Sequence, residues 1–334
     1  MDSLSLLPLA RTLVDIDSTT GQEGDCGRWL AAYLRRRGFR VEELPVSDSR
    51  FNVLATIDAP QVVLSTHFDC VPPFIPSRED GGVLYGRGAC DAKGILAAQI
   101  AALEQLRARD VREVGALFVV GEERGSDGAR VANAVPNACR FLINGEPTDS
   151  RLGLATRGAL RVKLTAAGRA GHSSFPETGE SAIEKLLDAL VRLRSIAWPA
   201  REPLGRTHYT IGLIGGGIAP NVIPPHAEAE VMFRTVGAAA DVLSLLAPAG
   251  DDVRIDVVLE VPPVTLATVP GFETAVFPFT TDIPFLDRWG TPLLFGPGSI
   301  LKAHTDHEQV PIAELHTAVD RYVDLATALL AREG

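Results

Sequence analysis

The 334-residue sequence has no excess of basic residues, no long uncharged apolar run and no closely spaced cysteines. It has 32 Lys and Arg against 42 Asp and Glu, which gives a net charge of −10. A nucleic acid or an anionic membrane would be repelled by this negative charge, so neither is an expected partner. No segment approaches the ~18 apolar residues of a membrane span, and residues 1–4 do not open a signal peptide. The four cysteines form no CxxC pair, so we interpret them as free thiols of a cytoplasmic protein.

The composition is that of a globular protein. Hydrophobic residues make up 46% and charged residues 22% of the chain. This is enough apolar material for a core, which excludes overall disorder and a disulfide scaffold. At roughly 100–200 residues per domain, the length allows two domains.

The first half of the sequence alternates between predicted helices and short apolar runs. Helical spacing predicts helices over 3–17, 24–37 and about 92–108. The apolar runs, each bounded by turn residues, are 53–57, 62–66, 116–120 and 141–143. Continuous apolar strands separated by helices predict an α/β domain with a largely parallel sheet covered on both faces.

The pattern changes near residue 158. Residues 160–164 alternate strictly between apolar and polar, as a half-exposed strand does. The elements predicted after it are a helix at 180–195, strands at 208–214 and 227–234, a helix at 238–247 and a strand at 253–260. This β-α-β-β-α-β run predicts an inserted ferredoxin-like α+β domain. After it, a strand at 292–295 and a helix at 312–332 return to the α/β pattern. We therefore expect a metal-binding catalytic domain at 1–157 and 261–334, and an inserted domain at 158–260.

Histidines and carboxylates follow the buried apolar runs where strands would end. Because consecutive parallel strands end at one edge of a sheet, we expect these side chains to share one crevice. Asp91 begins the helix that follows the turn at 86–90, and its carboxylate can lie in the same crevice. The residues concerned are His67, Asp91, Glu122, Glu123, Glu146 and His304.

Several carboxylates in one crevice repel one another, and divalent cations remove that cost. Two histidines with up to four carboxylates are too many ligands for one tetrahedral zinc ion, but they fit two ions that share a bridging carboxylate. No cysteine pair is placed to supply thiolates. The set therefore predicts two divalent cations, Zn²⁺ first, with Co²⁺ or Mn²⁺ as alternatives.

Taken alone, each motif has an ordinary interpretation. A His-x-Asp pair usually lies at the surface or caps a turn, and Glu122–Glu123 alone is usually a solvated charge pair. The glycine-rich segment 86–94 resembles a phosphate loop but lacks both GxGxxG and a GK[ST] ending. We interpret 215–217 as a turn, and His208, His226 and His316 as structural. The order and placement of the whole set favour the metal site.

Six motifs follow one another at Ser65–Pro72, Gly86–Gly94, Gly121–Glu123, Glu146–Pro147, Gly171–Ser173 and Ala303–Glu308. Together they resemble those of the M20 metallopeptidase family, which includes acetylornithine deacetylase, succinyl-diaminopimelate desuccinylase, aminoacylases and exopeptidases. The resemblance runs from about residue 10 to about residue 330.

The resemblance implies a role for each residue of the crevice. Glu122 would be the general base toward the attacking water, and Asp69 would hold the His67 ring in one tautomer. A cis peptide would follow Asp91, which would bridge the two metals. His307 is a less favoured ligand than His304. The implied metal ligands are His67, Asp91, Glu123, Glu146 and His304.

The resemblance also assigns residues of the inserted domain. His172 matches a histidine that reaches the other subunit's active site and polarises the scissile carbonyl, so a homodimer through a lid and dimerisation domain is implied. Asn221 and Arg234 match residues that grip the substrate. A surface ion pair with Glu228 or Glu230 is the alternative for Arg234, and a helix-capping turn is the alternative for 171–174. We also expect Gly298 and Ser299 to offer donors to the substrate.

The predicted function is that of a two-metal amidohydrolase or metallopeptidase. The segment 295–305 resembles the acetylornithine deacetylase branch, so an N-acyl amino acid is the first expected substrate, with a role in amino-acid biosynthesis. An exopeptidase or dipeptidase acting on short peptides, or a desuccinylase, is the alternative. A non-catalytic metal-binding protein on the same fold is less favoured, because Glu122 and all five ligands are present.

Overall fold

The structure, a computed structural model, describes residues 5–247 and 252–332 and divides into two compact units. Unit 1 comprises Met1–Leu154, Leu266–Ala275 and Thr281–Gly334, and unit 2 comprises Ala155–Thr265 and Val276–Thr280. The short segment Val276–Thr280 packs with unit 2, where the Arg157 N–H donates to the Phe277 carbonyl at 3.0 Å. The change of pattern near residue 158 therefore lies beside the first division.

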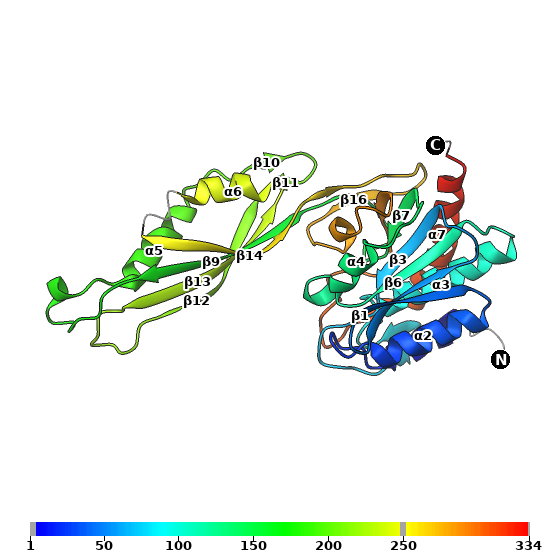
Figure 1. Cartoon of the computed structure of the whole chain (residues 1–334), viewed down its shortest axis with the longest axis horizontal. Helices are drawn as coiled ribbons and strands as arrows, with labels where there is room; N and C mark the ends of the chain where they lie inside the picture. Colours follow the sequence, from blue (N-terminus) through cyan, green and yellow to red (C-terminus); the bar gives the residue numbers. More distant parts are fainter. Residues whose placement is uncertain (1–4, 248–251, 333–334) are drawn as a thin grey trace. The chain divides into compact units, whose positions relative to one another are not determined.

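Unit 1 is built on a six-stranded mixed sheet (Figure 1). Its strands are β1 (Arg40–Ser47), β2 (Arg50–Thr56), β3 (Val62–His67), β6 (Val114–Val119), β7 (Phe141–Asn144) and β17 (Thr291–Leu294). They lie in the order β1-β2-β6-β3-β7-β17. β3 pairs in parallel with β6 and β7, and β17 pairs in parallel with β7. β2, the apolar run at 53–57, runs antiparallel to β6 and forms a hairpin with β1.

The buried strands of unit 1 contribute to two cores. Val62 and Leu64 of β3 belong to a large core, whereas Val63, which points the other way, belongs to a smaller one. The large core includes the apolar faces of α1 (Leu6–Val14), α2 (Gly24–Arg36), α3 (Lys93–Ala108) and α7 (Ile312–Leu330). The smaller core includes α4 (Asp127–Ala132) and residues beside the short 3₁₀ turn Ile283–Phe285. A continuous apolar run is thus explained by burial on both faces.

Two small sheets complete unit 1 and its junction with unit 2. β18 (Gln309–Pro311) pairs with β5 (Val83–Tyr85), which pairs with β4 (Arg78–Asp80). β8 (Leu152–Thr156) lies between β15 (Val264–Thr265) and β16 (Thr274–Phe277). Among the described residues, no helix combines the length and the apolar character needed to cross a membrane.

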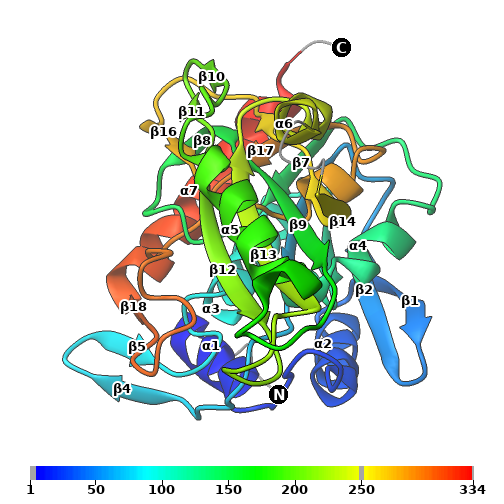
Figure 2. The ribbon, with the colours of Figure 1, turned by 90° about the vertical axis from the view of Figure 1, so that its left-hand side faces the viewer.

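Unit 2 has a four-stranded antiparallel sheet with helices on one face (Figure 2). The strands are β9 (Gly158–Ala167), β12 (His208–Gly216), β13 (His226–Thr235) and β14 (Val253–Val261), in the order β12-β13-β9-β14. With α5 (Ala182–Leu193) and α6 (Ala239–Leu246) they follow the chain order β-α-β-β-α-β, the ferredoxin-like pattern. A two-stranded ribbon of β10 (Ala200–Arg201) and β11 (Gly205–Arg206) lies between α5 and β12.

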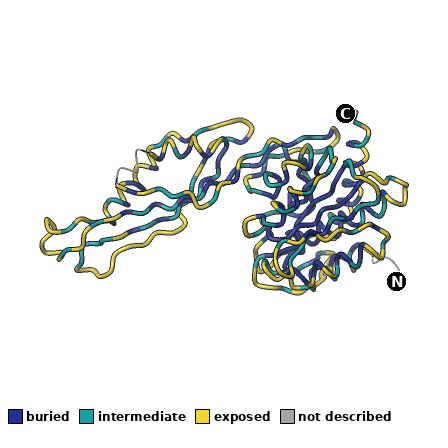
Figure 3. The backbone as a smooth tube through the Cα atoms, viewed as in Figure 1, coloured by how far each residue is buried: buried dark blue, intermediate teal, exposed yellow. Residues whose placement is uncertain are grey.

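Burial in unit 2 alternates along the strands, as Figure 3 shows by colour. On β13, Ala227, Ala229, Val231 and Phe233 are buried against the helices, while the residues between them are partly exposed. β12 is an edge strand and is exposed along nearly its whole length. The helices therefore cover one face, and the other face is open within this unit.

A candidate metal centre at the strand ends of unit 1

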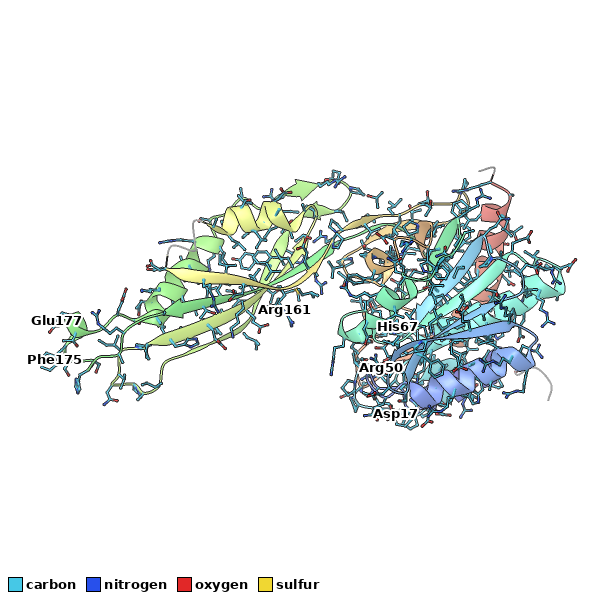
Figure 4. All side chains as sticks on the ribbon, in the orientation of Figure 1. Asp17, Arg50, His67, Arg161, Phe175 and Glu177 are labelled. Carbon is cyan, nitrogen blue, oxygen red and sulfur yellow. The ribbon has the colours of Figure 1, made fainter. Side chains whose placement is uncertain are left out.

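The predicted site residues of unit 1 lie where neighbouring strands end. His67 is the last residue of β3, and Figure 4 labels it at that end of the sheet. Glu122 and Glu123 form the 3₁₀ turn Glu122–Arg124 beyond β6, and Glu146 follows β7. β3, β6 and β7 are parallel neighbours, which is why they deliver these side chains to one edge.

Asp91 lies between the two histidines. Its Oδ1 is 3.1 Å from His67 Nε2, and its Oδ2 is 3.3 Å from His304 Nε2. His304 Nε2 is also 2.8 Å from Glu123 Oε1. Ligand atoms of His67, Asp91 and Glu123 all lie within 4.8 Å of one another. A carboxylate with one oxygen toward each histidine has the arrangement of a ligand shared by two cations.

The tautomer of His67 leaves its second nitrogen free to bind a metal. His67 Nδ1 is 3.0 Å from the Asp69 carbonyl oxygen, which only accepts hydrogen bonds. Nδ1 therefore carries a proton, and Nε2 is directed at the Asp91 carboxylate. Burial opposes the charged ring, but hydrogen bonds to Asp69 and Asp91 outweigh it and raise the pKa of His67 well above its ordinary value. The approach of Nε2 to this carboxylate is unfavourable unless a proton or a cation lies between the two groups.

The charges of the cluster also fit a cation. Burial and the neighbouring Glu146 raise the pKa of Glu122 well above its ordinary value, and burial raises the pKa of Glu146 as well. Glu146 Oε1 is buried without a hydrogen-bond partner among the described residues. Hydrogen bonds to Asp91 and Glu123 raise the pKa of His304 to about 10. These raised pKa values mean that the cluster favours bound protons, and divalent cations would supply the same positive charge in their place, so the donor set fits such cations.

Asp69 organises the turn that carries the two glutamates. Its Oδ1 accepts the Glu122 N–H at 3.0 Å, and its Oδ2 accepts the Glu123 N–H at 3.2 Å. The Thr20 hydroxyl donates to the same Oδ2 at 2.9 Å. The Asp69 side chain therefore fixes the backbone of Glu122 and Glu123, in addition to the contact of Asp69 with His67.

The two remaining ligand loops have special backbone geometry. The Asp91–Ala92 peptide is cis, as the resemblance implies. His304 has φ of 60°, in the left-handed region that non-glycine residues seldom occupy. His304, rather than His307, has the ring contacts with the cluster. The structure thus brings His304, the ligand favoured from the sequence, into contact with the cluster.

Arg50 is a supporting residue that the sequence did not indicate. Its guanidinium bonds Glu23, at 2.8 Å, and Asp127, at 2.6 Å through Nη1, and Figure 4 labels it below His67. The Asp127 carboxylate packs against Gly121, where a Cβ atom would lie 1.9 Å from Asp127 Oδ1. Arg50 therefore braces the chain on both sides of the Glu122–Glu123 turn.

Two other buried acids interact with residues of the cluster. Burial raises the pKa of Asp282 to about 7, and its charge acts on Glu122 and Glu146. Glu308 belongs to the Ala303–Glu308 motif, but its role depends on a contact with residues more than 200 positions away. Only the folded chain brings such partners together.

Gly298 and Ser299 lie beside Cys90 in unit 1. The Gly298 N–H donates to Glu314 Oε2 at 2.9 Å, so the backbone donor expected for the substrate is already taken. The Ser299 carbonyl accepts from Cys90 Sγ at 3.4 Å. No hydrogen bond of the Ser299 hydroxyl is found among the described residues, so this group can still donate to a substrate.

His172 and Asn221 come together in unit 2. The Ser173 N–H donates to the Asn221 carbonyl at 3.1 Å, and His172 and Val222 form an isolated bridge. The Ser174 N–H donates to His172 Nδ1 at 3.2 Å, which leaves Nε2 as the outer nitrogen. The same loop carries the exposed Phe175, labelled in Figure 4.

Arg234 lies on the open face of the unit 2 sheet. The acids expected as its alternative partners are taken: Glu228 pairs with Lys163 at 2.7 Å, and Glu230 pairs with Arg161 at 3.8 Å. Burial lowers the pKa of Arg234, and no carboxylate among the described residues pairs with it. Its cross-strand neighbour is His208, whose Nδ1 lies 2.7 Å from Arg157 Nη1. This end of the sheet is therefore a cluster of cationic and donor groups.

The sequence matches a known family over most of its length. A model of the Peptidase family M20/M25/M40 matches residues 63–328. A curated protein of Aspergillus fumigatus named probable carboxypeptidase is 38% identical over 385 residues, covering 98% of this chain and 88% of the relative.

Solved structures have the same fold. A tripeptidase from Staphylococcus aureus superposes with a TM-score of 0.82 at 20% identity, with 98% of each chain covered. A Bacillus subtilis protein described as a dinuclear metal-binding peptidase of the M20 family has a TM-score of 0.73 at 17% identity, with 97% of each chain covered. At these identities the likeness concerns the fold alone.

Proposed function

The chain belongs to peptidase family M20/M25/M40 and is a metal-dependent peptidase or amidohydrolase, and from this premise we propose that it is an exopeptidase that releases the C-terminal residue of short peptides. The observation that carries the proposal is Arg234, a partly buried guanidinium whose neighbouring acids are engaged elsewhere. A planar guanidinium binds a carboxylate through two parallel hydrogen bonds. The name of the Aspergillus relative, probable carboxypeptidase, supports the same substrate class.

We propose that two divalent cations, Zn²⁺ first and Co²⁺ or Mn²⁺ as alternatives, complete the site. His67 and Glu146 would hold one, Glu123 and His304 the other, and Asp91 would be shared. Bound there, the ions would supply Lewis acidity toward the attacking water and the scissile carbonyl. The dinuclear site named for the Bacillus neighbour supports the number of ions.

The chain's own residues handle the proton. Glu122 takes a proton from the attacking water and delivers it to the leaving amine, which needs a carboxyl whose pKa lies near the operating pH. Burial and Glu146 move the pKa of Glu122 upward, in the required direction. Asp69 holds the backbone N–H groups of Glu122 and Glu123 and so fixes where both carboxylates point.

We assign the remaining residues to substrate binding. Arg234 and Asn221 bind the free α-carboxylate, and the Ser299 hydroxyl adds a donor. His172 polarises the scissile carbonyl through Nε2, because its Nδ1 accepts a hydrogen bond within its own loop.

We propose that unit 2 serves as the lid and pairs two chains into a homodimer. β12 is an edge strand with unpaired backbone groups, and Ile211, Leu213 and Ile214 on it are exposed by 37%, 64% and 59%. An exposed apolar edge strand is a template for pairing with another chain. The four free cysteines support action in a reducing cytoplasm.

An N-acyl amino acid deacetylase, with a role in amino-acid biosynthesis, is the second candidate. The segment 295–305 favours it, and its substrates carry the same free α-carboxylate that Arg234 would bind.

A substrate panel with added Zn²⁺ or Co²⁺ separates the candidates. It contains dipeptides, tripeptides, their C-terminal amides, and N-acetyl and N-succinyl amino acids. The exopeptidase proposal predicts the highest kcat/KM on free-acid peptides and little turnover of the amides. Faster turnover of N-acetyl amino acids than of any peptide would instead establish the deacetylase, and turnover of amides at the free-acid rate would contradict both.

A further inference from the structure

A buried carboxylate, Glu308, lies between the chain segments that carry Asp91 and His304. Its side chain has no exposed surface, and that of its partner Arg87 is 3% exposed. Glu308 is four residues beyond His304 and directly precedes β18, which pairs with β5 just before the Asp91 loop.

One oxygen of Glu308 fills a nest of backbone amides. Its Oε1 accepts N–H groups from Gly88 at 2.9 Å, Cys90 at 3.1 Å and Asp91 at 3.0 Å. Converging backbone N–H groups of this kind form an anion-binding concavity. In the glycine-rich segment 86–94, which superficially resembles a phosphate loop, the anion is therefore the protein's own carboxylate.

The other oxygen is tied to the same two segments. Glu308 Oε2 accepts from Arg87 Nη1 at 2.7 Å, and the same Nη1 donates to the Thr305 carbonyl at 3.3 Å. The Gly86 N–H donates to the Glu308 carbonyl at 3.1 Å. Residues 86–91 and 304–308 are thus joined by hydrogen bonds that converge on Glu308.

We propose that Glu308 is a positioning residue that sets Asp91 relative to His304, so that the two metal positions form together. The inference rests on the proposed two-metal function. Its basis is geometric: the N–H of Asp91, the shared ligand, is held by a side chain from the loop of His304. Partners that orient metal ligands typically change metal affinity 10–100-fold when removed. Loss of the Glu308 carboxylate would let Asp91 and His304 move independently.

The test is Co²⁺ binding to the metal-free full-length protein, followed by the visible d–d absorption and by competition with a chelator. Glu308→Gln keeps an oxygen of similar reach but loses the charge that draws the amide groups and Arg87. We expect about 10–100-fold weaker Co²⁺ binding and an altered absorption band. At saturating Co²⁺ we expect kcat to fall more than KM changes, because the substrate-binding residues are intact.

Two variants act as controls. Glu104→Gln removes the charge from another ion pair, Arg37 Nε to Glu104 Oε1 at 2.6 Å, which has no contact with a proposed ligand. It should lower the denaturation midpoint and leave Co²⁺ affinity unchanged. Arg87→Lys keeps a cation beside Oε2 and leaves the amide nest intact, so it should weaken Co²⁺ binding less than Glu308→Gln does.

Several results would overturn the inference. Wild-type Co²⁺ affinity and absorption in Glu308→Gln would reduce Glu308 to a structural role. If Glu104→Gln weakened Co²⁺ binding as much as Glu308→Gln does, the effect would come from a general loss of stability. If Arg87→Lys weakened it equally, the hydrogen bonds from the backbone amides to Glu308 would not be the cause. If Glu308→Gln does not fold, Glu308→Asp, shorter by one methylene, replaces it, and the same comparison decides.

The metal titration keeps this inference apart from the proposed function, because it needs no turnover. A wild-type protein that binds two Co²⁺ ions but cleaves no substrate would contradict only the proposed function. A wild-type protein without Co²⁺ affinity would overturn both.

Discussion

The sheets of unit 1 and unit 2 differ in what they leave exposed. Every residue of β3 and β6 is buried, whereas burial on β13 alternates and β12 is exposed along nearly its whole length. The difference follows from covering both faces of one sheet and only one face of the other. The first arrangement can remove charged groups from water, and the second can present groups to another molecule.

Glutamates illustrate the consequence. In unit 1, burial raises the pKa of Glu122 and Glu146. On the open face of unit 2, the ammonium group of Lys163 lowers the pKa of Glu228. The same side chain thus retains its proton more strongly in one unit and forms a solvated ion pair in the other. The comparison teaches that burial, rather than residue type, separates the ionisation of the carboxyl groups in unit 1 from that on the open face of unit 2.

The largest expected effect breaks the chemistry of unit 1. Glu122→Gln should lower kcat by at least about 10²–10⁴-fold, because a neutral amide cannot accept a proton from the attacking water. Both metals should remain bound, since we assign Glu122 no ligand role. Metal analysis of the purified variant, beside kcat, checks the prediction. Glu123→Gln is the matched change at the adjacent residue and should lose a metal; the opposite pattern would reverse the two assignments.

The next effect tests recognition by unit 2. Arg234→Ala should cost about 2–5 kcal/mol in kcat/KM, because the substrate carboxylate would lose its charged partner. Amidating that carboxylate should cost the wild type a comparable amount and the variant much less. Arg161→Ala, on the same open face but paired with Glu230, is the control. Equal discrimination between acid and amide by wild type and Arg234→Ala would show that Arg234 does not read this group.

The edge strand of unit 2 gives a third prediction. Leu213→Lys should raise the dimer dissociation constant roughly tenfold or more, because two copies would bring like charges together across the interface. Sedimentation at several protein concentrations measures the shift. Val257→Lys, on the opposite edge strand β14, where Val257 is 48% exposed, is the matched control and should leave assembly unchanged.

Mixed dimers of two inactive variants test whether His172 acts on the other subunit. If it acts on the other subunit, a mixture of inactive His172→Ala and Glu122→Gln chains should recover part of the activity through hybrid dimers. A wild-type protein that is a strict monomer and fully active would contradict both the dimer and the action of His172 across it.

The smallest effect concerns the metal-free protein. The pKa of His304 is raised from 6.5 to about 10 in the folded protein. Its contribution to stability is therefore complete below pH 6.5 and is lost as pH rises toward 10. Asp282, with a pKa raised to about 7, also binds a proton more tightly when folded, so its effect has the same sign. Because the His304 side chain is half exposed, we expect its share of the loss between about pH 6.5 and pH 9 to be on the order of 1 kcal/mol, and the buried Asp282 adds to this loss.

Urea unfolding in the presence of a chelator checks this sign. The denaturation midpoint should fall as pH rises, and added Zn²⁺ should reverse the trend, because metal binding requires deprotonated ligands. A midpoint that rises with pH in the chelated protein would contradict the prediction.

The sequence by itself was sufficient to place His67, Glu122, Glu123 and Glu146 at one edge of a sheet. They lie within a few residues of the ends of apolar runs, and consecutive parallel strands end on the same side. The change of period near residue 158 likewise marked a second unit, because a half-exposed sheet must alternate. These features are local or periodic, and a linear sequence records such features directly.

Other features depended on the tertiary structure. The antiparallel direction of β2 is set by its hairpin with β1, and apolar content does not record strand direction. The bond from Gly298 to Glu314 and the hold of Asp69 on the Glu122–Glu123 turn are single contacts without a repeat. Glu308 reaches Asp91 across 217 positions. A hydrogen bond between such distant residues leaves no periodic pattern, so only the folded chain decides which carboxylate faces the candidate metal site and which one bonds the backbone around it.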